Sequence, residues 1–328
     1  MKNTRNLLAI ALFTILFASC GKTTAQNEKV VSADPTKFTC LKTGEIEGIF
    51  YLFTPDGKYF VHRLNHDSIV IRDVSTLTKI KTLKVDCNDC YINSLSKDGK
   101  YFIASEDAWE LSIRDMNSGK KITTLQDVKD VAWSPDGKYL AGFGSHSEGS
   151  VAIWDNTGKI IKIFRDVSLD EAFVLWSPDG KYLAFPSYRS EGIEKVVILD
   201  VSKGNKIKEF NVKDCNGLFW SENGKYLKCL DDDLVVVWDI NSGKEIKTIK
   251  TIKLNHDNLV CTEFSPDGKY LSTGKVDGSI IIFDLDSGEK IKTLQTNLKC
   301  AYHEWSPDGK CILAYNFFSK DIQIWGIK

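Results

Sequence analysis

The clearest structural signal in the chain is the stretch Trp176-Ser177-Pro178-Asp179-Gly180-Lys181-Tyr182-Leu183-Ala184-Phe185. Its Pro-Asp-Gly-Lys core occurs seven times, with substitutions in two copies, and the copies begin at Pro55, Lys97, Pro135, Pro178, Glu222, Pro266 and Pro307. From the first copy to the last is 252 residues in six steps, so the mean period is 42 residues. Seven periods of this length make 294 residues, which is the span from Pro35 to Lys328. A fixed period of this length indicates a repeat architecture that fills the chain after residue 35.

Within each period, hydrophobic residues alternate every two positions, as in Val151-Ala152-Ile153-Trp154-Asp155. This periodicity predicts β-strands, and the Asp-Gly and Ser-Gly pairs predict the turns between them. One period therefore predicts four short antiparallel strands. The first ends in an aromatic residue before Ser-Pro-Asp-Gly, the second starts at Lys-Tyr-Leu, the third ends at Trp-Asp or a variant, and the fourth reads Ile-Lys-Thr-Leu. Four such strands describe one blade of a β-propeller.

Seven periods predict an all-β, seven-bladed propeller over residues 36–328. The last period stops at its third strand, Ile322–Trp325, while an extra strand of the outer type, Phe38–Leu41, precedes the first inner strand. We expect the N-terminal strand to complete the last blade, because this arrangement closes the ring and leaves no open sheet edge.

Several of these motifs resemble a known family. Trp154-Asp155, Trp238-Asp239, the four Ser-Pro-Asp-Gly turns and the Asp277-Gly278 turn are similar to WD40 repeats, and the stretch 176–185 resembles the related repeat of TolB-type periplasmic propellers. The resemblance covers about nine tenths of the chain. It implies a propeller fold and says little about activity, because propellers serve many unrelated functions.

The first 20 residues differ in composition from the rest. Lys2 and Arg5 precede an apolar run, Leu7–Phe17, which is typical of a signal peptide over residues 1–19. The run ends in Ala18-Ser19-Cys20-Gly21, which resembles the lipobox of bacterial lipoproteins and implies that Cys20 is acylated. The alternative is cleavage after Ala25 and release of a soluble protein. We expect residues 20–35 to be a flexible tether. We expect the whole protein to be lipid-anchored in the bacterial cell envelope, in the outer membrane and facing the periplasm.

The overall charge limits the possible partners. The chain has 43 basic and 44 acidic residues, a net charge of −1. This balance lacks the basic surface of a general nucleic-acid binder, so we expect no nucleic-acid partner. Membrane contact is expected only through the lipid anchor, and the chain is expected to be a monomer.

Residues that break the repeat are the candidates for binding a partner. Large side chains without a repeated slot occur in hairpins between second and third strands, which share one face of a propeller with the blade-to-blade loops. The candidates are Trp109, Tyr188, Arg189, Phe317 and Phe318, together with the acidic run Asp231, Asp232 and Asp233. Aromatic residues and Arg are favoured at interaction hot spots. The alternatives are that each ring folds over its own blade and that the acidic residues, including Glu106, Asp107 and Glu110 in another hairpin, are solvated turn residues.

Chemistry of other kinds has little support in the sequence. The nine cysteines lie mostly in strand positions held by other small or apolar residues in sister repeats, and only Cys87 of the Cys87-Asn88-Asp89-Cys90 motif lies outside one. There is no Gly-x-Ser-x-Gly, phosphate loop or His-Glu-x-x-His motif, so we expect no catalytic residue, metal or cofactor.

The sequence favours a lipid-tethered scaffold that binds a protein or peptide. A propeller enzyme acting on a small molecule or glycan, and a structural subunit of an envelope complex, are the alternatives.

Overall fold

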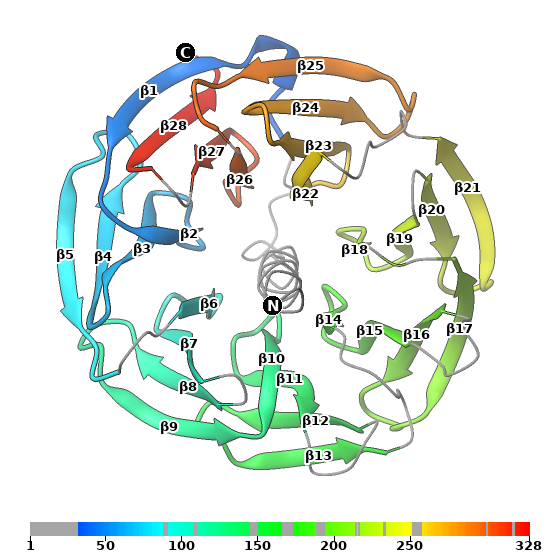
Figure 1. The fold of residues 1–328 in the computed structure, drawn as a ribbon. Helices are drawn as coiled ribbons and strands as arrows, with labels where there is room; N and C mark the ends of the chain where they lie inside the picture. The colour runs from blue at the N-terminus through cyan, green and yellow to red at the C-terminus, as the bar shows by residue number, and fades with distance from the viewer. Residues whose placement is uncertain are drawn as a thin grey trace, which may run out of the picture.

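The described part of the computed structural model forms a closed ring of seven four-stranded antiparallel sheets around a central axis (Figure 1). It describes residues 32–87, 91–107, 110–144, 150–165, 173–187, 194–213, 215, 217–231, 234–250, 258–299, 301–316 and 319–328. In blades one to six the strands follow chain order from the axis outward. The predicted seven-bladed propeller is confirmed.

The first four blades contain strands of two to seven residues. Blade one holds β2 (Ile49–Phe53), β3 (Tyr59–Asn65), β4 (Ser68–Asp73) and β5 (Lys79–Lys84). Blade two holds β6 (Tyr91–Leu95), β7 (Tyr101–Asp107), β8 (Glu110–Asp115) and β9 (Lys121–Gln126). Blade three holds β10 (Val128–Trp133), β11 (Tyr139–Gly144), β12 (Ser150–Asp155) and β13 (Ile160–Phe164). Blade four holds β14 (Leu175–Trp176), β15 (Tyr182–Ser187), β16 (Glu194–Asp200) and β17 (Lys206–Val212).

The remaining three blades complete the ring. Blade five holds β18 (Gly217–Trp220), β19 (Tyr226–Asp231), β20 (Leu234–Asp239) and β21 (Lys244–Lys250). Blade six holds β22 (Leu259–Phe264), β23 (Tyr270–Lys275), β24 (Ser279–Asp284) and β25 (Lys290–Gln295). Blade seven holds β26 (Tyr302–Trp305), β27 (Cys311–Tyr315), β28 (Asp321–Gly326) and the N-terminal strand β1 (Thr39–Glu45).

The ring closes in blade seven, as the repeat register predicts. β1 pairs antiparallel with β28 from Thr39 opposite Gly326 to Glu45 opposite Asp321. Figure 1 shows β1 as the outermost strand of this blade, beside β28. The N-terminal strand therefore supplies the fourth strand that the C-terminal part of the blade lacks.

The Pro-Asp-Gly-Lys motif forms the turn between the first two strands of each blade, and blade three shows why these residues recur. The Ser134 hydroxyl donates to Asp136 Oδ1 over 2.6 Å, and the same carboxylate oxygen accepts the backbone N–H of Lys138. The backbone N–H of Tyr139 in turn donates to the Ser134 hydroxyl. Gly137 has a φ of 71°, a conformation that other residues rarely adopt. The motif thus satisfies the polar groups of a tight turn locally.

The hydrophobic core is divided among the interfaces between blades. Buried side chains of the described residues form seven apolar clusters, and each cluster joins two neighbouring blades. The repeated Trp positions lie in or against these clusters, with Trp154, Trp176, Trp220, Trp238 and Trp305 buried and Trp133 and Trp325 half-buried. The predicted core role of the repeated Trp residues is confirmed, and each blade depends on its neighbours for burial.

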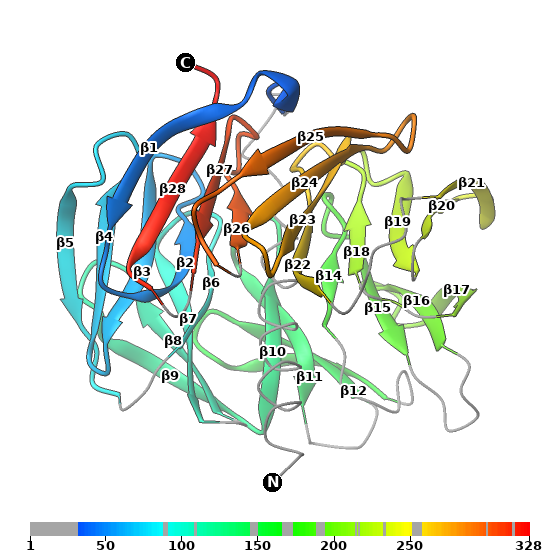
Figure 2. The same ribbon diagram turned by 45° about the horizontal axis from the view of Figure 1, so that its top comes forward.

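The ring has two faces. The turn face carries the seven Pro-Asp-Gly-Lys-type turns and the turns between third and fourth strands, and the loop face carries the hairpins between second and third strands and the blade-to-blade loops. Figure 2 shows the ring tilted from the view of Figure 1.

The segment before β1, Ser32–Phe38, is packed against the turn face and is called the lead segment below. The backbone N–H of Ser32 donates to Asp267 Oδ2 in the blade-six turn, and that of Ala33 donates to the Gly309 carbonyl in the blade-seven turn, each over 2.9 Å. The lead segment includes a short 3₁₀ turn, η2 (Pro35–Lys37), and ends at buried Phe38, whose ring lies 5.8 Å from that of Trp305. Residues 32–35 of the expected tether therefore belong to the packed domain. Among the described residues, no helix is long and apolar enough to cross a membrane.

Candidate functional site

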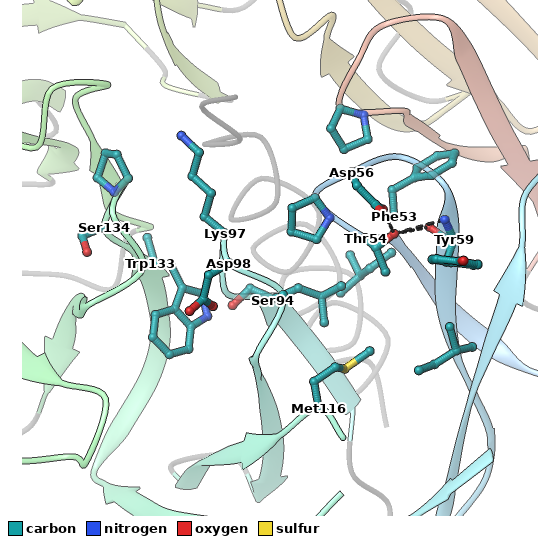
Figure 3. A pocket seen from close by; sticks show the side chains of 18 of the residues that line it. Phe53, Thr54, Asp56, Tyr59, Ser94, Lys97, Asp98, Met116, Trp133 and Ser134 are labelled. Carbon is teal, nitrogen blue, oxygen red and sulfur yellow. Dashed lines mark hydrogen bonds between the residues drawn. The ribbon is translucent and has the colours of Figure 1, made fainter. Parts of the chain in front are cut away.

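A cavity of about 580 Å³ lies on the turn face, against the turns of blades one to three (Figure 3). Its walls are mostly apolar and aromatic and come from several blades: Leu52, Pro55, Trp133, Pro135, Leu175 and Trp176. Blade seven contributes Pro307. The size and the apolar walls are typical of sites that enclose a small ligand or the end of a chain.

Most polar groups at this cavity are already committed to the fold. Asp56 Oδ1 accepts from the Thr54 hydroxyl and from the Lys58 backbone N–H within its own turn, and Asp98 holds the next turn in the same way. The Lys81 ammonium donates to the Asn117 carbonyl over 2.6 Å. These groups stabilise turns and the contact between blades, and they leave little charge free for a ligand.

Lys97 is the exception among the charged residues of the cavity. It occupies the position held by proline in five of the seven turns, and its half-buried side chain has no hydrogen bond or ion pair with any described residue. Lys100 in the same turn is different, because its ammonium pairs with the Asp98 carboxylate at 3.0 Å. Figure 3 shows the Lys97 side chain extended away from Asp98. Burial lowers the pKa of the Lys97 amine, and no described carboxylate opposes that shift.

Ser94 is the second polar exception. It lies on β6, two residues before the turn, where blades one, three, four and five have Leu52, Ala132, Leu175 and Phe219. The residue is 8% exposed, it lines the cavity, and its hydroxyl has no hydrogen-bond partner in the described part of the chain. A buried hydroxyl without a partner is uncommon in folded proteins.

The binding residues expected from the sequence are mostly outside the described residues. This holds for Cys20, Trp109, Tyr188, Arg189, Asp232, Asp233, Phe317 and Phe318, so their proposed roles remain predictions. Asp231 is described, at the end of β19, where its two carboxylate oxygens accept the backbone N–H of Lys213 over 3.1 and 3.2 Å. Asp231 therefore stabilises a blade-to-blade loop.

Glu106, at the start of the acidic hairpin of blade two, is paired with two basic side chains. Glu106 pairs with the Arg114 guanidinium at 2.6 Å and with the Lys121 ammonium at 2.8 Å. Burial alone would raise the pKa of the Glu106 carboxyl, but donors from Lys121, Ser112 and Arg114 hold it below its ordinary value. Arg114 itself is fully buried, in a slot that holds Trp in blades three and five. Glu106 is therefore a largely buried ion-pair partner, and the alternative that it is a solvated turn residue does not fit it.

One buried cluster has the residue types of a nucleophilic site. His303 Nδ1 lies 3.1 Å from Cys261 Sγ, and His303 Nε2 lies 2.6 Å from the Ser272 hydroxyl oxygen, which also accepts from Trp305 Nε1. Burial lowers the pKa of His303 to about 3 and raises that of the Cys261 thiol well above its ordinary value. Both groups are therefore neutral. A nucleophilic cysteine needs a thiolate that a neighbouring imidazolium or base stabilises, and this pair does not provide one. The cluster joins blades six and seven.

Other chemistry finds no described site. No group of three or more His, Cys, Asp or Glu side chains within the described ranges is arranged to hold a metal ion. Cys40, Cys215, Cys229, Cys261 and Cys311 are free thiols, whereas Cys87 is disulfide-bonded.

Comparisons with known proteins agree with this architecture. The family model described as WD domain, G-beta repeat, matches residues 244–284, which run from the start of β21 to the end of β24. The solved β-propeller domain of Cps50 (Swd1) from Myceliophteria thermophila aligns with 89% of this chain and 100% of its own, with a TM-score of 0.69 and 15% identity. The chain is a seven-bladed β-propeller, and residues 244–284 of it are similar to a WD40 repeat.

Two further matches cover parts of this propeller. A family model described as eukaryotic translation initiation factor eIF2A matches residues 115–188. The WD repeat-containing protein AAC3 of Dictyostelium discoideum is 28% identical over 157 residues, which are 47% of this chain and 32% of AAC3. The match thus spans about a third of that relative's length. At 15% identity, the likeness to Cps50 shows the fold alone.

Proposed function

We propose that this WD40-type propeller is a scaffold that binds a peptide segment of a partner protein in the cavity of the turn face. The observation that carries the proposal is the cavity itself, about 580 Å³ in volume, with apolar walls supplied by turns and strands of several blades. A rigid ring holds such walls in place without a ligand, so little ordering free energy is lost when a segment binds. WD40-type propellers are typical interaction scaffolds, which agrees with this function.

We also propose that the scaffold is tethered by a lipid on Cys20 in the bacterial cell envelope, at the outer membrane and facing the periplasm. The apolar run before Cys20 and the disulfide at Cys87 support export, because disulfides persist in oxidising compartments. Since the lead segment lies on the turn face, a tether of residues 21–31 would hold that face within about 40 Å of the lipid. The test is to express the chain in the presence of a radioactive fatty acid. We expect the wild-type chain to be labelled and a Cys20→Ser variant not to be labelled. Equal labelling of both would contradict the tether.

A peptide selection tests the binding site. A soluble library of synthetic dodecapeptides with free ends is mixed with the purified propeller, and bound peptides are identified by mass spectrometry. We expect enriched peptides with apolar residues that bind wild type and lose at least about tenfold in affinity on a Ser94→Leu variant. Leucine fills part of the cavity, and the equivalent positions of blades one and four already hold Leu52 and Leu175, so the fold tolerates it.

The control is a double variant on the loop face, Trp109→Ala with Phe317→Ala. Peptides that keep their affinity for this control and lose it on Ser94→Leu place binding in the cavity. The reverse pattern would move the site to the loop face and contradict the proposal, and so would a selection that enriches no peptide.

A further inference from the structure

Blade two departs from the repeat at two positions that both line the cavity. Ser94 replaces the apolar residue found in blades one, three, four and five, and Lys97 replaces the proline found in five turns. The remaining turn that lacks proline has Glu222, which does not line the cavity. Both changes in blade two put a hydrogen-bond donor where most sister blades have an apolar side chain and the others have Glu.

The charge of Lys97 has no counterpart in the described part of the molecule. The two carboxylates of the cavity belong to Asp56 and Asp98, and each is held by donors in its own turn. A half-buried ammonium group without a partner carries an unfavourable desolvation free energy, which an anionic ligand would offset. The cavity is therefore complementary to an apolar ligand that carries one negative charge.

The number and type of donors indicate which anion fits. Phosphate groups are typically bound by clusters of Arg or by several backbone N–H groups, whereas the donors at this cavity without a described partner are the Lys97 ammonium, the Ser94 hydroxyl and the buried Trp133 indole N–H. A single carboxylate matches the one positive charge in that set. The C-terminal residue of a peptide joins a carboxylate and a side chain at the same carbon atom, so it can place the charge on Lys97 and the side chain against the apolar wall.

We propose that the cavity binds the C-terminal end of a partner peptide, with an apolar last residue against Leu52, Trp133 and Leu175 and its carboxylate on the Lys97 ammonium. This inference rests on the proposed peptide-binding function and names the part of the peptide that enters.

The experiment compares acids with amides. Each peptide enriched from the dodecapeptide library is made with a free C-terminal carboxylate and with a C-terminal amide, and both forms are titrated by fluorescence polarisation. We expect the free acid to bind at least about tenfold more tightly to wild type, and the difference to fall below about threefold on Lys97→Pro and Lys97→Gln variants. Lys97→Pro restores the residue of the sister turns, so it should fold, which thermal unfolding checks.

Glu222→Pro is the matched control, because it makes the corresponding change in the blade-five turn, away from the cavity; it should keep the full preference for the acid. Equal affinity of acid and amide, or an unchanged preference on Lys97→Pro, would overturn this inference. If Ser94→Leu still abolished binding in that case, the proposed function would stand without it.

A second probe, 3-phenylpropanoate, separates a peptide end from a small acid. We expect it to bind at least about tenfold more weakly than the best peptide, since it fills less of the cavity. Affinity equal to that of the best peptide would show that the cavity is a site for small carboxylic acids and would contradict the assignment to a peptide end.

Discussion

Asp130 places an ionisable carboxyl in the buried core, and keeping it buried at neutral pH has a cost in folding free energy. It lies on β10 at a position held by Phe173, Cys261 and Tyr302 in other blades, and burial raises the pKa of its carboxyl to about 7. In the unfolded chain the same carboxyl has its ordinary pKa near 4. The contribution of this group to stability is therefore fully present below pH 4 and is lost as the pH rises towards 7.

An Asp130→Asn variant tests this cost. The amide does not ionise, so the variant should be more stable than wild type at pH 8, by about 1 to 3 kcal/mol, with the difference vanishing near pH 4. Urea unfolding of both proteins at pH 4, 6 and 8 measures it. A difference that is constant with pH would show that the carboxyl does not titrate as described.

The outer strands show a repeated contact between neighbouring blades. In several of them a lysine donates to a carbonyl in the turn between third and fourth strands of the next blade: Lys42 to Ser75, Lys81 to Asn117, Lys162 to Val201 and Ser202, and Lys247 to Leu285 and Asp286. Lys292 makes the same kind of contact with Thr36 of the lead segment. Blade two has Thr123 at this position. The repeated lysines are therefore inter-blade contacts as well as surface charges.

Removal of two such lysines should loosen the ring. The double variant Lys162→Thr with Lys247→Thr uses the residue that blade two already has, and it should lower the free energy of unfolding by about 1 to 3 kcal/mol. The matched control is Lys79→Thr with Lys290→Thr, which changes exposed lysines on β5 and β25 that make no such contact with a described residue. Denaturant unfolding compares them. Equal losses in the two double variants would show that only charge or strand propensity matters.

The sequence predicts the strands and the ring well because each depends on local pattern. The Ser-Pro-Asp-Gly turns fold through contacts within six residues, and the buried Trp positions repeat with the period, so both are visible in one dimension. The cavity could not be predicted from the sequence, although Lys97 and Ser94 visibly break the repeat. Only the fold shows that these two residues line one cavity together with residues of blades one, three and four. The pairing of Glu106 with Arg114 was missed for a related reason: the repeat places Arg114 in a Trp slot, but it does not show that a carboxylate of the same blade reaches the guanidinium there.

The whole molecule depends on β1. Because β1 completes blade seven, a deletion of residues 36–44 should open the ring, expose the edge of β28 and lower the melting temperature by at least about 10 °C. A deletion of residues 21–31 leaves the lead segment and β1 in place and should change the melting temperature by less than about 2 °C. Calorimetry of the two truncated proteins decides between these outcomes, and equal melting temperatures would contradict closure by β1.

The lead segment has a mechanical consequence for a propeller held at its N-terminal end. Tension at Ser32 would act first on its hydrogen bond to Asp267, then on the bond from Ala33 to Gly309, and then on the packing of Phe38 against Trp305. These contacts belong to blades six and seven. Each of these blades is held together by the backbone hydrogen bonds between its own four strands. A pull would thus be shared between two blades before it reached the β1–β28 ladder, so the strand that seals the ring is shielded from the load.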